Sequence, residues 1–441
     1  MIDRAAAFRR DYERGMDLLA AGKDDEAMSI MFRAAKAAPE GWLAVACQLI
    51  KDGRQDLALQ RLREVLTLSN NAKVRAAALN NIGMILANGG RNDSAHEAFT
   101  ESAALWPDCP DTHSNMGLIA QWRADYAGAL KHLDTALALD PWHEQASFCR
   151  AMVLLLSGDY ARGWDAYECR WRSRHNNLAK IATPVLEWDG RETDSLLIYG
   201  EQGQGDFLLS LRFAKQCQTR CRNQYWVTQR GMAPLAAMMP NIQVIQVGDT
   251  LPEFTAHLPC MSLPRVLGVQ YDDLRGSSYL PRPTPVDYGP GYHVGICWRG
   301  SHAQGNDVFR STHLSEWGPA LEVPGVTYHS LAVEFADEAL LYPQIVREAP
   351  PRDWLETAQR VAGMDLVITV DTGVAHLAGA MGIPCWVAMH CRPYFVYPPS
   401  AGDCTPWYKS LRLFRQAREL QWGQVFECIA KSLHEKIQSH L

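Results

Sequence analysis

The chain has 441 residues, of which 47% are hydrophobic and 21% are charged, and its formal net charge is −6. This composition is typical of folded globular proteins, and the length exceeds one ordinary core, so we expect about two to four domains. No stretch approaches the ~18 uncharged apolar residues that a membrane span requires, and the negative charge argues against general binding of nucleic acid.

The amino-terminal segment and the cysteines are typical of an intracellular protein. Residues 1–30 are charged throughout and lack the apolar core of a secretory signal, so the expected compartment is the cytoplasm. The cysteines have no repeated spacing, and Cys217 and Cys221 have no second pair at zinc-finger distance. We therefore expect reduced, buried thiols and no metal site.

Residues 6–170 repeat with a period of about 34 residues, and small residues occur where two helices of each unit must touch. The matching positions are Gly83, Ala95, Phe99 and Pro107 in one unit and Gly117, Ala129, Leu133 and Pro141 in the next. The pattern continues into a final helix pair with Ala151, Tyr160, Gly163 and Tyr167.

This repeating segment resembles the tetratricopeptide-repeat family. The resemblance implies an α-solenoid of stacked helix pairs with a concave groove. Either the groove binds a protein segment, or the array only braces the domain that follows it.

An α/β pattern begins after the repeats, where Pro184, Gly190 and a polar stretch mark a boundary. The predicted strands are 195–199, 224–228 and 242–247 before a linker at 280–291, and 292–298, 326–333, 364–370 and 385–389 after it. The predicted domains are a repeat solenoid at 1–175 and two Rossmann-like, doubly wound domains at 176–288 and 289–441. We expect a ligand to bind in the cleft between the two doubly wound domains.

The turn after strand 195–199 reads GEQGQGD and supplies Gly203, Gly205 and Asp206. Glycines at such a turn let backbone amides approach a ligand closely. The spacing is not G-x-G-x-x-G, and Gln229 rather than an acidic residue follows the next strand, which argues against an oxidoreductase that uses a nicotinamide cofactor. Asp206 is either a helix cap or a general base that faces the cleft.

The turn after strand 364–370 reads DTGVAH and is the most specific motif of the chain. Asp371 precedes a helix that Thr372 and Gly373 open, and the free amides and dipole of such a helix favour a diphosphate. His376 lies in the first turn of this helix. It either donates to a phosphate or to a developing negative charge, or it is a structural histidine.

A long polar loop follows strand 292–298. We expect Trp298, Arg310 and Ser311 to lie on this loop, on the same side of the sheet as His376. Arg310 either pairs bidentately with phosphate oxygens or is a solvated surface residue.

These stretches resemble the bacterial tetratricopeptide-containing glycosyltransferases of family 9, which are relatives of the lipopolysaccharide heptosyltransferases and similar in architecture to O-GlcNAc transferases. The resemblance rests on both turns, on CWRGS and RSTHLSEW within 297–317, on SLAVEF at 330–335 and on TPWYKSLRLFRQ at 405–416.

The resemblance implies a GT-B fold and inverting sugar transfer without a metal. The second doubly wound domain would hold the nucleotide diphosphate of the donor at Asp371, Thr372, Gly373 and His376, and Asp206 would take the position of the acceptor-side base. Helix amides and Arg310 would offset the charge of the leaving group.

One segment departs from the family pattern. The family follows its last core strand with an Asp-Trp-Arg-Trp-like segment, whereas this chain has HCRPYFVYPPSAGDC at 390–404. Arg392, Tyr394 and Phe395 would have to substitute in the donor pocket.

Two functions from different classes remain open. The first is a cytoplasmic inverting glycosyltransferase that takes a nucleotide-diphosphate sugar as co-substrate, without a metal or further cofactor, and acts on a protein or glycan acceptor along the repeats. The second is a non-catalytic scaffold with a vestigial transferase fold. Asp206 and the 371–376 motif favour the enzyme, and the altered 390–404 segment favours the scaffold.

Overall fold

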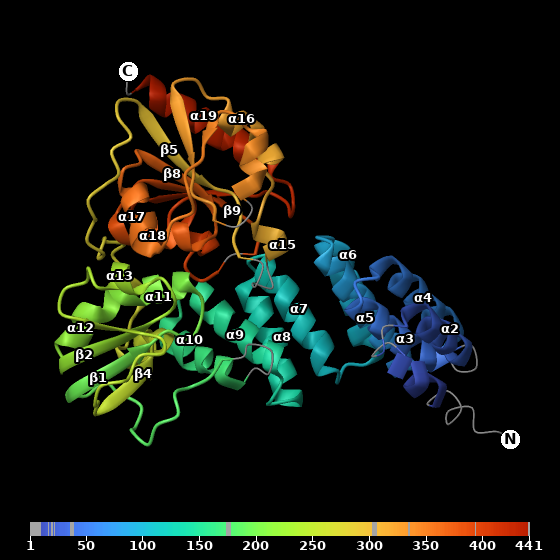
Figure 1. Cartoon of the computed structure of the whole chain (residues 1–441). Helices are drawn as coiled ribbons and strands as arrows, with labels where there is room; N and C mark the ends of the chain where they lie inside the picture. The colour runs from blue at the N-terminus through green and yellow to red at the C-terminus, as the bar shows by residue number, and fades with distance from the viewer. Residues whose placement is uncertain are drawn as a thin grey trace. The chain divides into compact units, whose positions relative to one another are not determined.

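The computed structural model in Figure 1 describes residues 10–15, 17–18, 21, 23–35, 39–172, 178–301, 307–333, 336–392 and 394–439. The chain divides into two compact units, Met1–Val153 and Leu154–Leu441. This division lies earlier than the predicted boundary at residue 175, because the last predicted repeat helix packs against residues of the α/β unit.

The first unit is an array of helices that pack against one another in chain order. The helices are α2 (Asp24–Ala35), α3 (Pro39–Lys51), α4 (Gln55–Leu68), α5 (Ala72–Asn88), α6 (Asn92–Leu105), α7 (Pro110–Trp122) and α8 (Tyr126–Leu139), and α9 (Glu144–Leu156) runs across the division. A Cβ added at Gly83 would come within 2.5 Å of Phe99, and one at Gly117 within 2.5 Å of Leu133. Gly83 and Phe99, and Gly117 and Leu133, are matching positions of two successive predicted units, and each glycine lies against its partner in the structure. The predicted helical repeat array is therefore confirmed.

The second unit begins with the end of α9 and α10 (Tyr160–Tyr167), and its first sheet has four parallel strands in the order β3-β2-β1-β4. The strands are β1 (Thr193–Tyr199), β2 (Cys221–Thr228), β3 (Gln243–Gln246) and β4 (Ala256–Pro259), and the helices are α11 (Gln204–Ser210), α12 (Ala214–Gln218), α13 (Ala233–Ala236) and α14 (Leu263–Val266). The three strands predicted here are confirmed, and the sequence reading missed β4.

The second sheet has six parallel strands in the order β10-β9-β8-β5-β6-β7. The strands are β5 (Tyr292–Cys297), β6 (Val326–Ser330), β7 (Ile345–Val346), β8 (Leu366–Val370), β9 (Cys385–Met389) and β10 (Leu411–Arg415), and the helices are α15 (Asp307–Arg310), α16 (Gly318–Leu321), α17 (Trp354–Ala362), α18 (Gly373–Met381) and α19 (Gly423–Gln438). Helices α16 and α19 cover one face of this sheet, and α17 and α18 cover the other (Figure 1). The predicted parallel α/β architecture is therefore confirmed.

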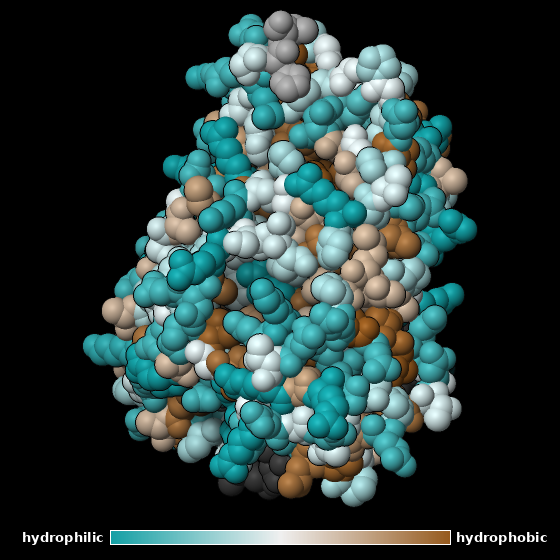
Figure 2. Space-filling model, turned by 90° about the vertical axis from the view of Figure 1, so that its left-hand side faces the viewer, coloured by the Kyte–Doolittle hydropathy of each residue, from teal (hydrophilic) through white to brown (hydrophobic). Residues whose placement is uncertain are grey.

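Hydrophilic residues dominate the molecular face in Figure 2, where hydrophobic residues form small separate groups. Within the described parts of the chain, no helix has the length and apolar character needed to cross a membrane. The cysteines are free thiols, but Cys404 and Cys428 are exposed, contrary to the expectation that the thiols are buried.

The packing of α10 predicts how much of the repeat segment can be deleted without unfolding the α/β unit. Tyr160 and Trp164 are fully buried; the Tyr160 hydroxyl accepts a hydrogen bond from the indole of Trp407 at 3.0 Å, and Trp164 packs edge-on against Phe395. Loss of one such aromatic side chain costs about 3–5 kcal/mol of unfolding free energy. We expect a protein that starts at residue 142 to unfold cooperatively, and one that starts at residue 166 to melt at a much lower temperature or to be insoluble.

Circular dichroism melting curves of the two truncated proteins measure the difference. Equal melting temperatures would mean that α10 contributes nothing to the α/β unit.

Candidate functional site

Two helix starts from different sheets meet at this site. Helix α11 follows β1 and α18 follows β8, and the two helices pack against each other. A Cβ added at Gly205 would lie 2.8 Å from Cδ2 of His376, so only glycine lets the backbone of α11 approach the imidazole this closely. The two predicted motifs are thus neighbours in space. The sequence predicted that the backbone at Gly205 lies close to a ligand. In the structure Gly205 makes room for the side chain of His376 instead.

Asp206 accepts hydrogen bonds at both carboxylate oxygens. The backbone N–H of Gly203 donates to Oδ2 at 3.1 Å, and the hydroxyl of Tyr394 donates to Oδ1 at 3.3 Å. Burial, reinforced by the nearby charge of Glu201, raises the pKa of Asp206 to about 7. Asp206 therefore caps the start of α11 through its bond to Gly203, which was one of the two predicted roles. Its pKa also suits the other predicted role, a general base near neutral pH.

His376 is buried and uncharged at neutral pH. Burial lowers the pKa of His376 to about 4, and this outweighs the nearby negative charge of Asp371. Its Nδ1 lies 2.9 Å from the hydroxyl of Tyr408. The imidazole can therefore offer a ligand one neutral N–H at most, because the Tyr408 contact involves the other ring nitrogen.

Asp371 lies beside a histidine that the sequence reading missed. Nε2 of His390 is 3.8 Å from Oδ2 of Asp371, and His390 is 4% exposed. Burial acts to raise the pKa of Asp371, but the hydrogen-bonding capacity and charge of His390 lower it overall. His390 directly follows β9, which is the neighbour of β8, and the shared carboxyl edge of parallel strands was the signal for finding it.

Arg310 is held at the same turn. Its Nη1 donates to the backbone carbonyl of Asp371 and its Nη2 to that of Ser301, each at 3.0 Å, and the side chain is 11% exposed. The alternative of a solvated surface arginine is therefore wrong. The hydroxyl of Ser311 donates to Asp307 at 2.5 Å and accepts from Gly300 N–H at 3.0 Å, so this side chain holds the loop together.

Three other predicted donor-binding residues face the protein interior. Trp298 directly follows β5 at the start of the loop, as predicted, but its indole is fully buried in the core of the second sheet and donates to Glu338 at 2.8 Å. The hydroxyl of Thr372 lies 2.9 Å from that of Thr369. A Cβ at Gly373 would come within 2.7 Å of Trp354, so this glycine makes room for a tryptophan. Thr372 and Gly373 can therefore contact a ligand only through their backbone at the start of α18.

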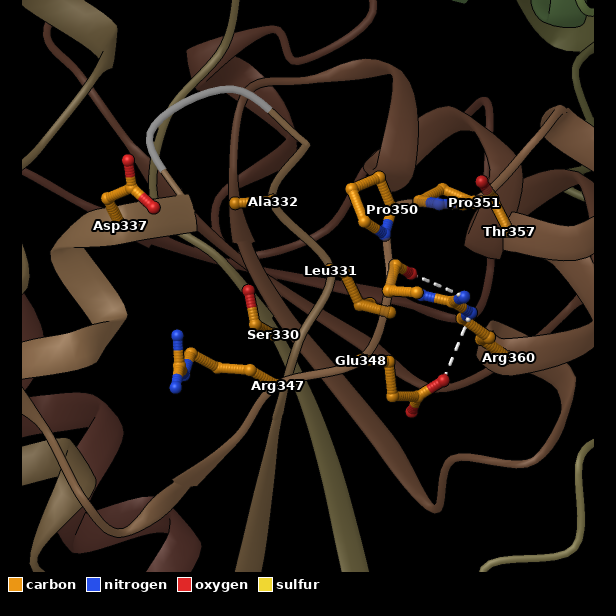
Figure 3. Close-up of a pocket in the computed structure, with 11 residues that line it drawn as sticks. Ser330, Leu331, Ala332, Asp337, Arg347, Glu348, Pro350, Pro351, Thr357 and Arg360 are labelled. Atoms are coloured by element: carbon orange, nitrogen blue, oxygen red, sulfur yellow. Dashed lines mark hydrogen bonds and ion pairs between the residues drawn. The ribbon is translucent and has the colours of Figure 1, made fainter.

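A pocket of about 220 Å³ opens at the carboxyl ends of β6 and β7 (Figure 3). Leu331, Ala332, Pro350 and Pro351 give it apolar walls. The hydroxyl of Ser330 lines it and has no hydrogen-bond partner among the residues that the structure describes. Figure 3 shows the guanidinium of Arg360 turned toward Glu348, with Nε 3.1 Å from a carboxylate oxygen. The sequence reading missed this pocket, and Glu334 and Phe335 of the SLAVEF motif lie outside the described residues.

Comparison with known proteins gives one family match. Residues 336–390 match the family model of glycosyltransferase family 9 (heptosyltransferase), and this range includes the DTGVAH turn and ends at His390.

Comparisons with individual proteins give further, distant similarities. Protein FlbA of Caulobacter vibrioides is 24% identical over 447 residues, which cover 90% of this chain and 73% of FlbA. Among solved structures, PilF of Pseudomonas aeruginosa is 19% identical, with a TM-score of 0.35 over 49% of this chain and 87% of PilF. A structure of MamA is 16% identical, with a TM-score of 0.32 over 40% of this chain and 100% of MamA.

The contact between Gly205 and His376 predicts the effect of one added methyl group. Gly205→Ala should destabilise the protein by about 1–3 kcal/mol, because the buried imidazole has no room to retreat. Gly423→Ala is the control, since no atom lies within 4 Å of its added Cβ. Urea unfolding of both variants measures the difference, and equal midpoints would show that the two helix starts are not tightly packed.

The raised pKa of Asp206 predicts a pH-dependent stability. A carboxyl group whose pKa is higher in the folded state favours folding below its unfolded pKa, and this contribution is lost as the pH rises to the folded value of about 7. Asparagine does not titrate, so the melting temperature of Asp206→Asn should exceed that of the parent by a margin that grows from pH 5 to about pH 7 and then levels off. If the difference in melting temperature between Asp206→Asn and the parent does not change with pH, the pKa of Asp206 is not raised in the folded state.

Proposed function

We propose that this tetratricopeptide-repeat-containing, glycosyltransferase family 9-like chain is an inverting transferase of the GT-B type with two Rossmann-like lobes. The observation that carries the proposal is the position of Asp206, whose turn touches His376 of the motif on the other sheet. A carboxylate with a pKa of about 7 thus lies beside a helix start that suits a diphosphate.

The donor side of the proposed site is the carboxyl edge of the second sheet. The first amides of α18 and the guanidinium of Arg310 would bind the diphosphate of a nucleotide sugar. The pocket in Figure 3 would take the base, because its apolar walls suit a flat ring. Helix α17 connects the two regions, since Thr357 lines the pocket and Trp354 contacts Gly373.

The proposed reaction needs only groups of this chain and its substrates. Asp206 removes the proton from an acceptor hydroxyl, whose oxygen bonds to the anomeric carbon as the bond to the diphosphate oxygen breaks on the opposite face. Attack opposite the leaving group inverts the configuration of that carbon. Helix amides and Arg310 stabilise the charge of the nucleotide diphosphate, so no metal is required. The acceptor is a protein or a glycan that the repeats present.

A non-catalytic scaffold is the second candidate. The observation that favours it is the Tyr394 hydroxyl, which occupies Oδ1 of Asp206, an oxygen that an acceptor hydroxyl would need to reach. A scaffold would transfer no sugar, whether or not it binds a nucleotide.

Asp206→Asn separates the two functions. If Asp206 is the base, transfer from a nucleotide sugar should slow by about 10²–10⁴-fold, because asparagine cannot take the proton of the acceptor. The donor is first identified as the nucleotide sugar that raises the melting temperature of the parent protein. Turnover is then measured at saturating donor and acceptor, alongside nucleotide binding and melting. Turnover near the parental rate, or none in the parent with any donor that binds, would contradict the proposal.

A further inference from the structure

Two polar side-chain contacts connect Asp206 to the last helix of the repeat pattern. The Tyr394 hydroxyl donates to Asp206 at 3.3 Å, and its oxygen lies 3.1 Å from the hydroxyl of Tyr167. The single proton of Tyr167 can go either to Tyr394 or to Oε1 of Gln202, which is 2.9 Å away. Tyr167 ends α10, Tyr394 belongs to the altered 390–404 segment, and Gln202 precedes α11. Three separate parts of the chain thus contribute to one chain of hydroxyl groups that ends on the proposed base.

Packing holds both phenol rings in place. Tyr167 is 1% exposed and contacts Trp164 and Phe395 edge-on, with ring centroids 6.0 and 6.2 Å apart. The ring of Tyr394 lies 4.1 Å from that of Phe395. These ring contacts fix the position of the Tyr394 hydroxyl oxygen beside Asp206.

The surroundings of Asp206 contain no other side-chain donor in hydrogen-bond contact with it among the described residues. Its other hydrogen bond comes from the backbone of Gly203. The titratable groups around it are Glu201 on its own turn, Asp371 and His376 from the second sheet and α18, Tyr394 and Tyr397 from the 390–404 segment, Tyr167 from α10 and Cys260 from η3 (Cys260–Ser262). The carboxylates Glu201 and Asp371 disfavour a negative charge on Asp206, so a hydrogen bond to its ionised form has a large effect.

We propose that Tyr394 is a positioning residue that keeps Asp206 ionised and correctly oriented, and that Tyr167 fixes Tyr394, so that the last repeat helix forms part of the acceptor-side centre. The positioning role rests on the proposed function, whereas the effect on Asp206 ionisation can be measured without substrate. Tyr394 would yield Oδ1 to the acceptor hydroxyl as the acceptor binds. The altered segment would then be an adaptation of the site and not a sign of lost activity.

Tyr394→Phe and Tyr167→Phe test the proposal, because each keeps the ring and removes one hydroxyl. The protonation of Asp206 is followed by infrared absorption of its carboxyl group across pH, with Asp206→Asn to assign the band. Tyr394→Phe should raise the midpoint of the Asp206 titration by about one pH unit, because the ionised carboxylate loses a hydrogen bond. Tyr167→Phe should raise it by a smaller amount, because Tyr394 keeps its bond but loses its anchor.

Tyr397→Phe is the matched control. Tyr397 lies in the same segment and is fully buried, and its hydroxyl makes no hydrogen bond to any residue whose position is described. We expect this variant to leave the Asp206 titration unchanged. An unchanged titration in Tyr394→Phe, or an equal shift in the control, would overturn the proposal. If Tyr394→Phe does not fold, Tyr167→Phe decides alone, and an unshifted titration there overturns it.

The pH dependence of kcat/KM connects the ionisation to transfer. The acidic limb of the profile should move to higher pH in Tyr394→Phe by the same amount as the infrared titration. A shifted titration in a protein that transfers no sugar would support the role of Tyr394 in ionisation and contradict the proposed function. Transfer with an unshifted limb would support the enzyme and contradict the role of Tyr394.

Discussion

The contact between Gly205 and His376 is the constraint on which the site depends. Because a hydrogen atom stands where any other residue would have a side chain, the start of α11 can lie directly against an imidazole of α18. His376 is buried at this contact, and Asp206 is partly shielded from water beside it. Desolvation keeps His376 neutral and raises the pKa of Asp206 toward neutrality, so one steric requirement accounts for the protonation states of both predicted catalytic residues.

The carboxylates near this contact differ in the partners that the fold gives them. Glu201 and Glu168 both pair with the fully buried guanidinium of Arg170, and Asp371 has His390 beside it. Among the residues that the structure describes, Asp206 contacts a backbone amide and a phenol but no cation. Burial raises the pKa of both Glu201 and Asp206, but an arginine counteracts this at Glu201 and none does so at Asp206 among the described residues.

Helix α10 belongs to the repeat pattern by sequence and to the α/β unit by packing. Its residues Tyr160 and Trp164 are buried against aromatic side chains of the segment around Trp407, and Tyr167 reaches the hydroxyl of Tyr394. The 390–404 segment contributes Tyr394 and Phe395 to these contacts.

Local patterns in the sequence determined the helical repeats, the parallel strands other than β4, β7 and β10, and the two turns that carry Asp206 and the 371–376 motif. Helix spacing, strand alternation and turn glycines act over a few residues, so they can be read without a structure. Only the tertiary structure decided that Trp298 is buried, that His390 accompanies Asp371 and that Tyr394 reaches Asp206. Each of these depends on which distant segments share an edge of a sheet, and both pKa shifts and hydrogen bonds arise from those neighbours and not from the residue's own place in the chain.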